Sequence, residues 1–210
     1  MNKPKPFVRV IKLVKYFLSS IKMISIIQNW FIMPLGVFGI WDFSKGEILK
    51  LKNGLKFFAM DYMDGWTINE VFGDNDYKIH FSNKSATIID IGANIGTFSI
   101  FAAYKMPYAK ILSYEPGRKA FLQLRENILL NEMDGRVFPN KLAVYKNKSS
   151  IKLYDSGRTG LGSVYRVRGE KKFEVVPTTT LEGIFIKNKI KVCDYLKIDC
   201  EGAEYEILSS

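Results

Sequence analysis

The sequence contains few of the residues that build metal sites and disulfide frameworks. Its 210 residues include two cysteines, Cys193 and Cys200, and a single histidine, His80. A zinc site needs several such ligands at short spacing, so the sequence offers no zinc site. Along one strand, at about 3.3 Å per residue, the two cysteines would lie too far apart for a disulfide. Free thiols are typical of a reducing compartment, and we therefore expect a cytoplasmic protein.

Acidic residues are absent from the first part of the chain. Residues 1–41 carry only positive charges, at Lys3, Lys5, Arg9, Lys12, Lys15 and Lys22. The whole chain has 31 Lys and Arg, 21 Asp and Glu, and a net charge of +10. Much of the positive excess therefore belongs to the N-terminus and is not the broad basic footprint of a nucleic-acid-binding protein. We expect no nucleic-acid partner.

An apolar run suited to crossing a membrane is also missing. Within residues 7–33, apolar side chains recur at spacings of three and four, which predicts an amphipathic helical segment over residues 1–45. Lysines interrupt residues 7–22, polar amides and Pro34 interrupt residues 23–41, and there is no cleavage site typical of a signal peptide. The helical segment either packs on its own domain or a partner, or lies peripherally on an anionic membrane at its inner face.

A β-rich lead-in is predicted over residues 46–84. Apolar and polar residues alternate on both sides of Asn53-Gly54, the pattern of a two-residue hairpin. Residues 61–72 then predict a loop and a short helix, in which Asp64 and Glu70 are either loop acids in water or site residues.

The central motif lies between residues 87 and 116. Thr87-Ile-Ile-Asp90 predicts a buried parallel strand, Gly92 to Gly96 a glycine turn, and Thr97 onward a helix. The next strand ends at Tyr114-Glu115-Pro116. Together these form a nucleotide-binding βα unit, in which an acid at Glu115 can accept hydrogen bonds from ribose hydroxyls.

The turn lacks the middle glycine of the dinucleotide-binding fingerprint G-x-G-x-x-G. Ala93 and Asn94 stand between Gly92 and the next glycine, Gly96, which disfavours a pyrophosphate. S-adenosylmethionine (SAM) has no phosphate, and its amino-acid tail can be held by Asp90 and the backbone of the turn. SAM is therefore the expected cofactor. An NAD-dependent oxidoreductase and a non-catalytic, membrane-apposed binding module are the less favoured alternatives.

The remaining chain predicts more strands and helices of an α/β domain. They are a helix from Pro116 to Asn131, strand regions at 136–139 and 142–145, antiparallel strands within 149–177, a Thr180-capped helix and a strand at 192–199. Ala143 is small enough either to admit an adenine ring or to pack in the core. Because ligands bind at the carboxyl ends of parallel strands, Asp90, Glu115 and Asp199 are expected to meet at one site.

These motifs together resemble the FkbM-type methyltransferases. The resemblance rests on Asp90-Ile-Gly-Ala-Asn-Ile-Gly96, Tyr114-Glu-Pro116, Thr180-Leu-Glu182 and Leu196-Lys-Ile-Asp-Cys-Glu-Gly-Ala-Glu204. It implies a Rossmann-like class I methyltransferase sheet with an antiparallel insertion in a domain over residues 85–210. It also implies SAM-dependent O-methylation of a hydroxyl on a small molecule, sugar, glycan or related metabolite.

The resemblance also implies residue roles. Asp199 and Glu201 would face the transferred methyl, one as the base and the other orienting the acceptor. The residues expected to bind SAM are Asp90, Gly92, Ala93, Asn94, Gly96, Thr97, Glu115, Pro116 and Ala143. A class I sheet continues beyond the strand at 193–199, whereas this chain stops in the helix after Glu204. We therefore expect a missing C-terminal region or an oligomer partner to cover that strand.

Overall fold

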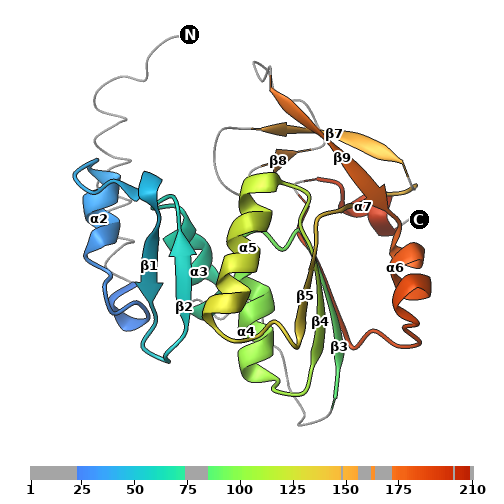
Figure 1. Ribbon diagram of the computed structural model, residues 1–210, viewed down its shortest axis with the longest axis horizontal. Coiled ribbons are helices and arrows are strands. Elements are labelled where there is room, and N and C mark those ends of the chain that lie inside the picture. Colours follow the sequence, from blue (N-terminus) through green and yellow to red (C-terminus); the bar gives the residue numbers. More distant parts are fainter. Residues whose placement is uncertain are drawn as a thin grey trace. The chain divides into compact units, whose positions relative to one another are not determined.

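The computed structural model describes residues 23–73, 85–147, 149–155, 162–163, 172–200 and 202–208. The chain divides into two compact units, Met1–Lys78 and Ile79–Ser210 (Figure 1). No helix within the described ranges is both long and apolar enough to cross a membrane.

The first unit contains the predicted hairpin. Strands β1 (Glu47–Lys50) and β2 (Lys56–Ala59) pair antiparallel. The backbone N–H of Leu51 donates to the carbonyl of Leu55 at 2.8 Å, so the loop has one residue more than the predicted two. Gly54 in this loop has φ +92°, and the Asn53 side chain accepts from the N–H of Leu55 at 3.2 Å. A left-handed glycine at the end of the loop is the usual solution for this longer turn.

The segment before the hairpin packs on the same unit. Its described residues, from Met23 onward, form two short 3-10 helices and one α-helix: η1 (Met23–Ser25), α2 (Ile32–Val37) and η2 (Phe43–Lys45). Ile27 forms a β-bridge with Leu51, and the Asn29 amide donates to the carbonyl of Ile48 at 2.9 Å. Met23, Ile27 and Met33 are completely buried. This part of the predicted amphipathic segment therefore packs on its own unit, and residues 7–22 lie outside the described ranges.

Helix α3 (Asp64–Phe72) is the short helix predicted in the lead-in. Ile68 is fully buried and Val71 nearly so. Asp64 is only 3% exposed, because one carboxylate oxygen accepts from the N–H groups of Met60 and Asp61 at 2.8 and 3.2 Å. This acid therefore fixes the helix start instead of standing in water.

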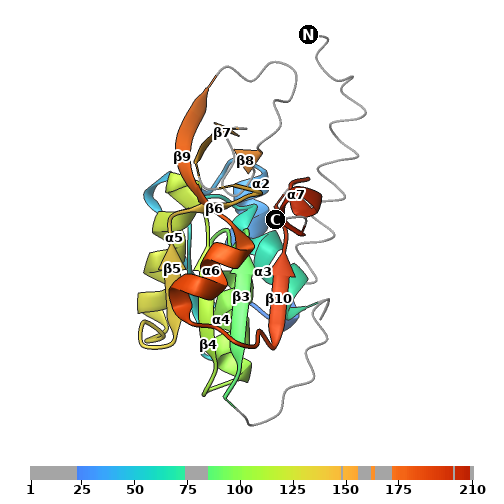
Figure 2. The same ribbon diagram turned by 90° about the vertical axis from the view of Figure 1, so that its right-hand side faces the viewer.

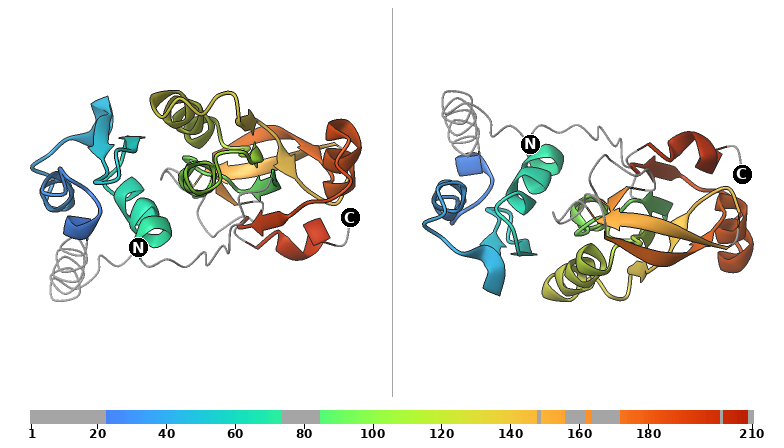
Figure 3. Two further views of the ribbon diagram at one scale, coloured as in Figure 1. Left: turned by 90° about the horizontal axis from the view of Figure 1, so that it is seen from below. Right: turned by 90° about the horizontal axis from the view of Figure 1, so that it is seen from above.

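The second unit is built on a parallel sheet of order β10-β3-β4-β5. Helix α4 contacts β4 and α5 contacts β5. Helices α6 and α7 lie on the opposite face (Figures 1 and 3). There, Ile184 and Ile207 pack with Ile89 and Ile91 of β3. The elements are β3 (Thr87–Ile91), α4 (Thr97–Lys105), β4 (Lys110–Tyr114), α5 (Arg118–Leu130), β5 (Val137–Asn140), α6 (Leu181–Asn188), β10 (Tyr195–Ile198) and α7 (Glu204–Leu208).

The antiparallel insertion is present as predicted and forms its own sheet, of order β6-β9-β7-β8 (Figure 2). Strand β7 pairs antiparallel with β8 and β9, while β6 pairs parallel with β9. The strands are β6 (Ala143–Val144), β7 (Ser150–Asp155), β8 (Gly162–Ser163) and β9 (Phe173–Thr179). After β9, the hydroxyl of Thr180 accepts from the N–H of Gly183 at 2.9 Å, which confirms the predicted helix cap.

The order of the parallel sheet confirms a Rossmann-like α/β fold. The chain leaves β3 towards β4 on one side, and β10 lies against β3 on the other. Such a switch point is where open α/β sheets bind ligands. Within the described ranges β10 is the terminal strand of this sheet, at the position expected from the sequence.

Candidate active site

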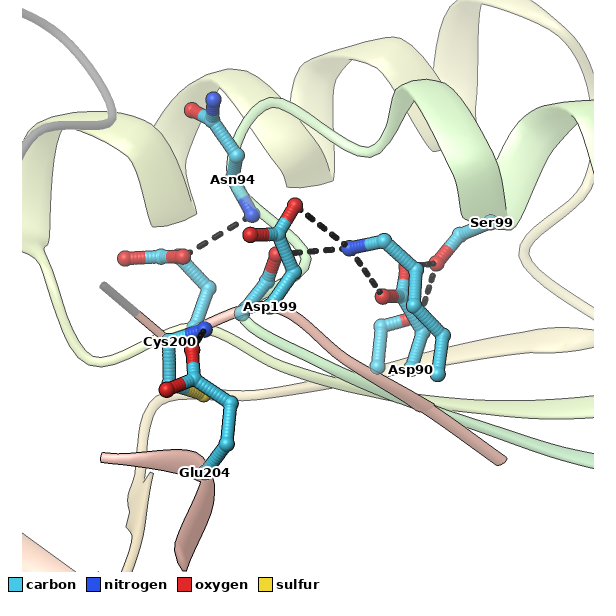
Figure 4. A network of polar contacts seen from close by, with 10 residues as sticks. Asp90, Asn94, Ser99, Asp199, Cys200 and Glu204 are labelled. Carbon is cyan, nitrogen blue, oxygen red and sulfur yellow. Dashed lines mark hydrogen bonds and ion pairs between the residues drawn. The ribbon is translucent and has the colours of Figure 1, made fainter. Parts of the chain in front are cut away.

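The carboxyl ends of β3, β4 and β10 bring the three predicted acids into one region, and Figure 4 labels two of them, Asp90 and Asp199. Asp90 lies in β3 and Glu115 directly follows β4. Asp199 follows β10, and its backbone N–H donates to the carbonyl of Ile91 at 3.0 Å. Glu115 is joined to the glycine turn because one of its carboxylate oxygens accepts from the N–H of Asn94 at 2.9 Å.

The glycine turn is shaped by close contact with the end of β10. Gly92 has φ +77° and Gly96 has φ +89°, both in the region that favours glycine. A Cβ atom at Gly92 would overlap the carbonyl oxygen of Asp199. Gly92 is therefore required both by its backbone conformation and by the strand packed against it.

Asp90 is completely buried and contacts protein groups through both carboxylate oxygens. Oδ2 accepts from the hydroxyl of Ser99 at 2.6 Å, and Ser99 Oγ also lies 2.6 Å from the hydroxyl oxygen of Ser113. Oδ1 forms an ion pair with Lys197 Nζ at 3.2 Å. We expected Asp90 to contact the cofactor, whereas these contacts direct its carboxylate towards Ser99 of α4 and Lys197 of β10.

Lys197 is a site residue that the sequence analysis missed. It is 8% exposed, and its Nζ lies 3.2 Å from the carbonyl oxygen of Gly92 and 3.5 Å from Oδ2 of Asp199. A lysine within an otherwise apolar strand is rarely buried unless it is paired. It also shares one face of the strand with Asp199, two residues on. Those two features together could have identified it.

Glu115 is a buried carboxyl held by backbone donors. It is 8% exposed, and Gly117 donates to its second oxygen at 2.8 Å. Burial raises the pKa of Glu115 from 4.5 to about 7, although the N–H groups of Gly117 and Asn94 favour the charged form. Such a carboxyl accepts further hydrogen bonds well once it is ionised.

The turn also contains buried polar atoms that fit a ligand. Within the described ranges, Asn94 Oδ1 and Thr97 Oγ1 are buried without a hydrogen-bond partner. Glu115 can accept from ribose hydroxyls, and these two side chains offer further polar contacts, so the residues present fit SAM. Ala93 is buried and Pro116 partly exposed. Ala143 is buried in a cluster with Leu153 and Val176 of the β6-β9-β7-β8 sheet.

The turn after β10 presents an exposed acid. The Asp199 side chain is 63% exposed, in contrast to Asp90 and Glu115. The turn is closed by Glu204, which accepts from the N–H groups of Cys200 and Gly202 at 2.9 and 3.2 Å. Backbone donors, its own N–H first, lower the pKa of Glu204. Glu201, the second predicted catalytic acid, lies outside the described ranges.

The two cysteines are free thiols. Burial raises the pKa of Cys200 to about 12, so its thiol is a poor nucleophile at neutral pH. In the part of the chain that the structure describes, no group of three or more His, Cys, Asp or Glu residues is arranged to hold a metal ion. Among the described acids of this site, Asp199 has an exposed carboxylate, whereas Asp90 and Glu115 are buried.

Comparison with known proteins places this site within a characterised sequence family. The profile of the Methyltransferase FkbM domain matches residues 90–210. Methyltransferase sdnD from Sordaria araneosa is 29% identical over 187 residues, which cover 73% of this chain and 71% of sdnD. The 31-O-demethyl-FK506 methyltransferase FkbM from Streptomyces tacrolimicus is 31% identical over 94 residues, covering 43% of this chain and 36% of that protein.

A solved structure gives a weaker match. The M. jannaschii tRNA m1G37 methyltransferase aligns with a TM-score of 0.33 and 22% identity, over 45% of this chain and 29% of that chain. The regions matched to FkbM and to the tRNA m1G37 methyltransferase each cover well under two thirds of this chain and of the matched protein.

Proposed function

Because the chain belongs to the FkbM methyltransferase family, we propose that it methylates a hydroxyl of a sugar, a glycan or a related small metabolite. The family makes it a SAM-dependent methyltransferase, and the proposal concerns the acceptor. The observation that carries it is the exposed Asp199 carboxylate, which lies beside the glycine turn and is joined to it through Lys197.

The residues of the turn are proposed to bind SAM. Ionised Glu115 would accept hydrogen bonds from the ribose hydroxyls, and the backbone between Gly92 and Thr97 would face the amino-acid tail. Ala93, Asn94, Gly96, Pro116 and Ala143 complete the proposed binding set. Asp90 would support this site from between the sheet and α4, since its carboxylate contacts Ser99 and Lys197.

Asp199 is proposed as the catalytic base. Bound SAM supplies a methyl group on a sulfonium, which is already a strong electrophile. A hydroxyl, in contrast, is a weak nucleophile until its proton is removed, and Asp199 would take that proton as the oxygen attacks. Glu201 would orient the acceptor. Alignment of the acceptor oxygen with the methyl group supplies much of the acceleration, about 7–11 kcal/mol in well-oriented reactions.

The first test is cofactor binding. Calorimetric titration of the whole chain with SAM, and separately with NAD, distinguishes the methyltransferase from an oxidoreductase. We expect SAM to bind and NAD not to bind. Binding of NAD alone would reject the proposal.

The second test is methyl transfer. SAM with a deuterated methyl group is supplied with a panel of saccharides, hydroxylated metabolites and RNA, and the products are analysed by mass spectrometry. We expect label on a hydroxyl oxygen, a strong reduction in the Asp199→Asn variant, and no label on RNA. Label on RNA would overturn the expected acceptor. SAM binding without transfer to any acceptor would favour the non-catalytic module.

A further inference from the structure

One ammonium group joins three parts of the site that come from separate segments of the chain. Lys197 Nζ lies 3.2 Å from Asp90 Oδ1 in β3, 3.2 Å from the Gly92 carbonyl oxygen in the turn, and 3.5 Å from Asp199 Oδ2 after β10. Figure 4 shows the Asp90 and Asp199 side chains on either side of this contact point.

Only one of these three contacts is needed to explain why Lys197 can be buried. A buried ammonium needs an opposite charge, and Asp90, itself completely buried, provides it. Neutralisation therefore accounts for the Asp90–Lys197 pair. It does not account for the placement of the same ammonium beside the turn and the exposed carboxylate.

Asp199 gains the most from this placement. At 63% exposure its side chain is free to rotate unless a partner holds it. Its backbone is fixed by the hydrogen bond to Ile91, and Lys197 restrains the carboxylate that projects from it. The ammonium thereby links the acid to the backbone of the cofactor turn.

We infer that Lys197 is a positioning residue, which holds the Asp199 carboxylate next to the SAM-binding turn and couples the two. This inference rests on the proposed function for the roles of Asp199 and the turn. The coupling between Asp199 and the turn through Lys197 can be tested without any acceptor.

Several other groups surround Lys197 and bear on the design of the test. Asp90 faces it from β3 and Asp199 from its own strand, and the Phe98 ring of α4 lies 5.8 Å from Nζ. The Glu115 carboxyl and the Cys200 thiol also interact electrostatically with Lys197. Substitutions at 197 must therefore remove the charge of Asp90 at the same time, so that no buried charge is left without a partner.

The binding test measures SAM affinity by calorimetry in four proteins: wild type, Asp199→Asn, Asp90→Asn/Lys197→Met, and the triple variant. If Asp199 acts on the turn through Lys197, D199N weakens SAM binding about threefold or more in the wild type and has little effect in the double-variant background. An equal loss in both backgrounds would show that Lys197 serves only to neutralise Asp90.

A spectroscopic test covers the case in which the double variant does not fold. Amide resonances of the isotope-labelled chain are compared between wild type and D199N without cofactor. The matched control is Asp194→Asn. Asp194 directly precedes β10, and its side chain accepts from the N–H of Thr87, at the end of β3 opposite to the glycine turn. We expect D199N to shift the Gly92 and Ala93 resonances and D194N to leave them in place.

The two failures are separable. If D199N does not move the resonances of the turn, the inference on Lys197 is wrong whether or not the protein binds SAM. If the wild-type chain does not bind SAM, the proposed function fails while the resonance shifts still test the coupling.

Discussion

Lys197 and Asp90 face each other in register on neighbouring parallel strands, with Nζ 3.2 Å from Oδ1. Both side chains are buried, at 8% and 0% exposure. The pair is therefore an internal ion pair of the sheet as well as part of the candidate active site. Its two partners are interdependent, since either one alone would be a buried charge.

The first prediction concerns the stability of this pair. Lys197→Met leaves the Asp90 carboxylate buried without its counter-charge, which should reduce the free energy of unfolding by about 3–5 kcal/mol. The Asp90→Asn/Lys197→Met variant removes both charges and should recover most of that loss. Urea denaturation followed by circular dichroism measures both variants. A double variant as unstable as K197M would contradict this account.

The second prediction concerns the pH dependence set by Glu115. Its pKa is raised from 4.5 to about 7 by burial, so the folded protein favours the protonated carboxyl. The contribution of Glu115 to the free energy of unfolding is therefore fully present below pH 4.5. It is lost as the pH rises through about 7, a change of about 3 kcal/mol in total. Glu115→Gln should not show this loss. The comparison is made by urea denaturation between pH 5 and 8, with Glu126→Gln on the exposed face of α5 as the control.

SAM binding should have the opposite dependence on pH. Ribose hydroxyls donate hydrogen bonds to an ionised carboxylate, so binding should favour the charged form of Glu115 and release a proton below pH 7. Affinity should therefore rise as the pH increases through 7. Calorimetry in buffers of different ionisation enthalpy measures the proton release. Equal proton release in E115Q would exclude Glu115 as its source.

The third prediction concerns the contact between the turn and β10. Gly92→Ala places a Cβ atom on the carbonyl oxygen of Asp199 in a backbone conformation with φ +77°. We expect a loss of about 1–3 kcal/mol in stability and loss of detectable SAM binding. Gly135→Ala is the matched control, because a Cβ atom there meets no atom within 4 Å. Thermal unfolding and calorimetry are the measurements, and a G92A protein that binds SAM normally would refute the close packing.

The fourth prediction concerns the basic N-terminus. Peripheral contact with an anionic membrane through residues 7–33 remains a proposal, and Met23, Ile27 and Met33 within that range are buried in the first unit. Deleting only residues 1–22 therefore removes the basic segment and spares this packing. We expect the intact chain to sediment with phosphatidylserine-containing vesicles, and less so as salt is added. The deletion should abolish this sedimentation. Unchanged sedimentation would reject the membrane proposal.

The sequence was sufficient for features that depend on local chemistry. The strand–turn–helix unit around Gly92 and the Thr180 cap follow from residue types whose preferences act over a few positions. The convergence of Asp90, Glu115 and Asp199 follows from the rule that parallel strands end at one edge of the sheet.

Other features depend on residues distant in the chain. The role of Lys197 was missed because its partner Asp90 comes from another strand and becomes its neighbour only through the sheet register. The inward direction of the Asp90 carboxylate likewise depends on Ser99 and Ser113, which no motif identifies. The burial of Asp64 arises from a local loop geometry that its acidic character does not suggest.

The dual position of Lys197 has a consequence for how activity could be lost over evolutionary time. Asp199 is exposed, so a descendant could replace it at small thermodynamic cost. Replacing Lys197 without also replacing Asp90 would leave a buried charge unpaired, at a much larger cost. We therefore expect inactive descendants to lose Asp199 first and the buried pair of Lys197 and Asp90 last.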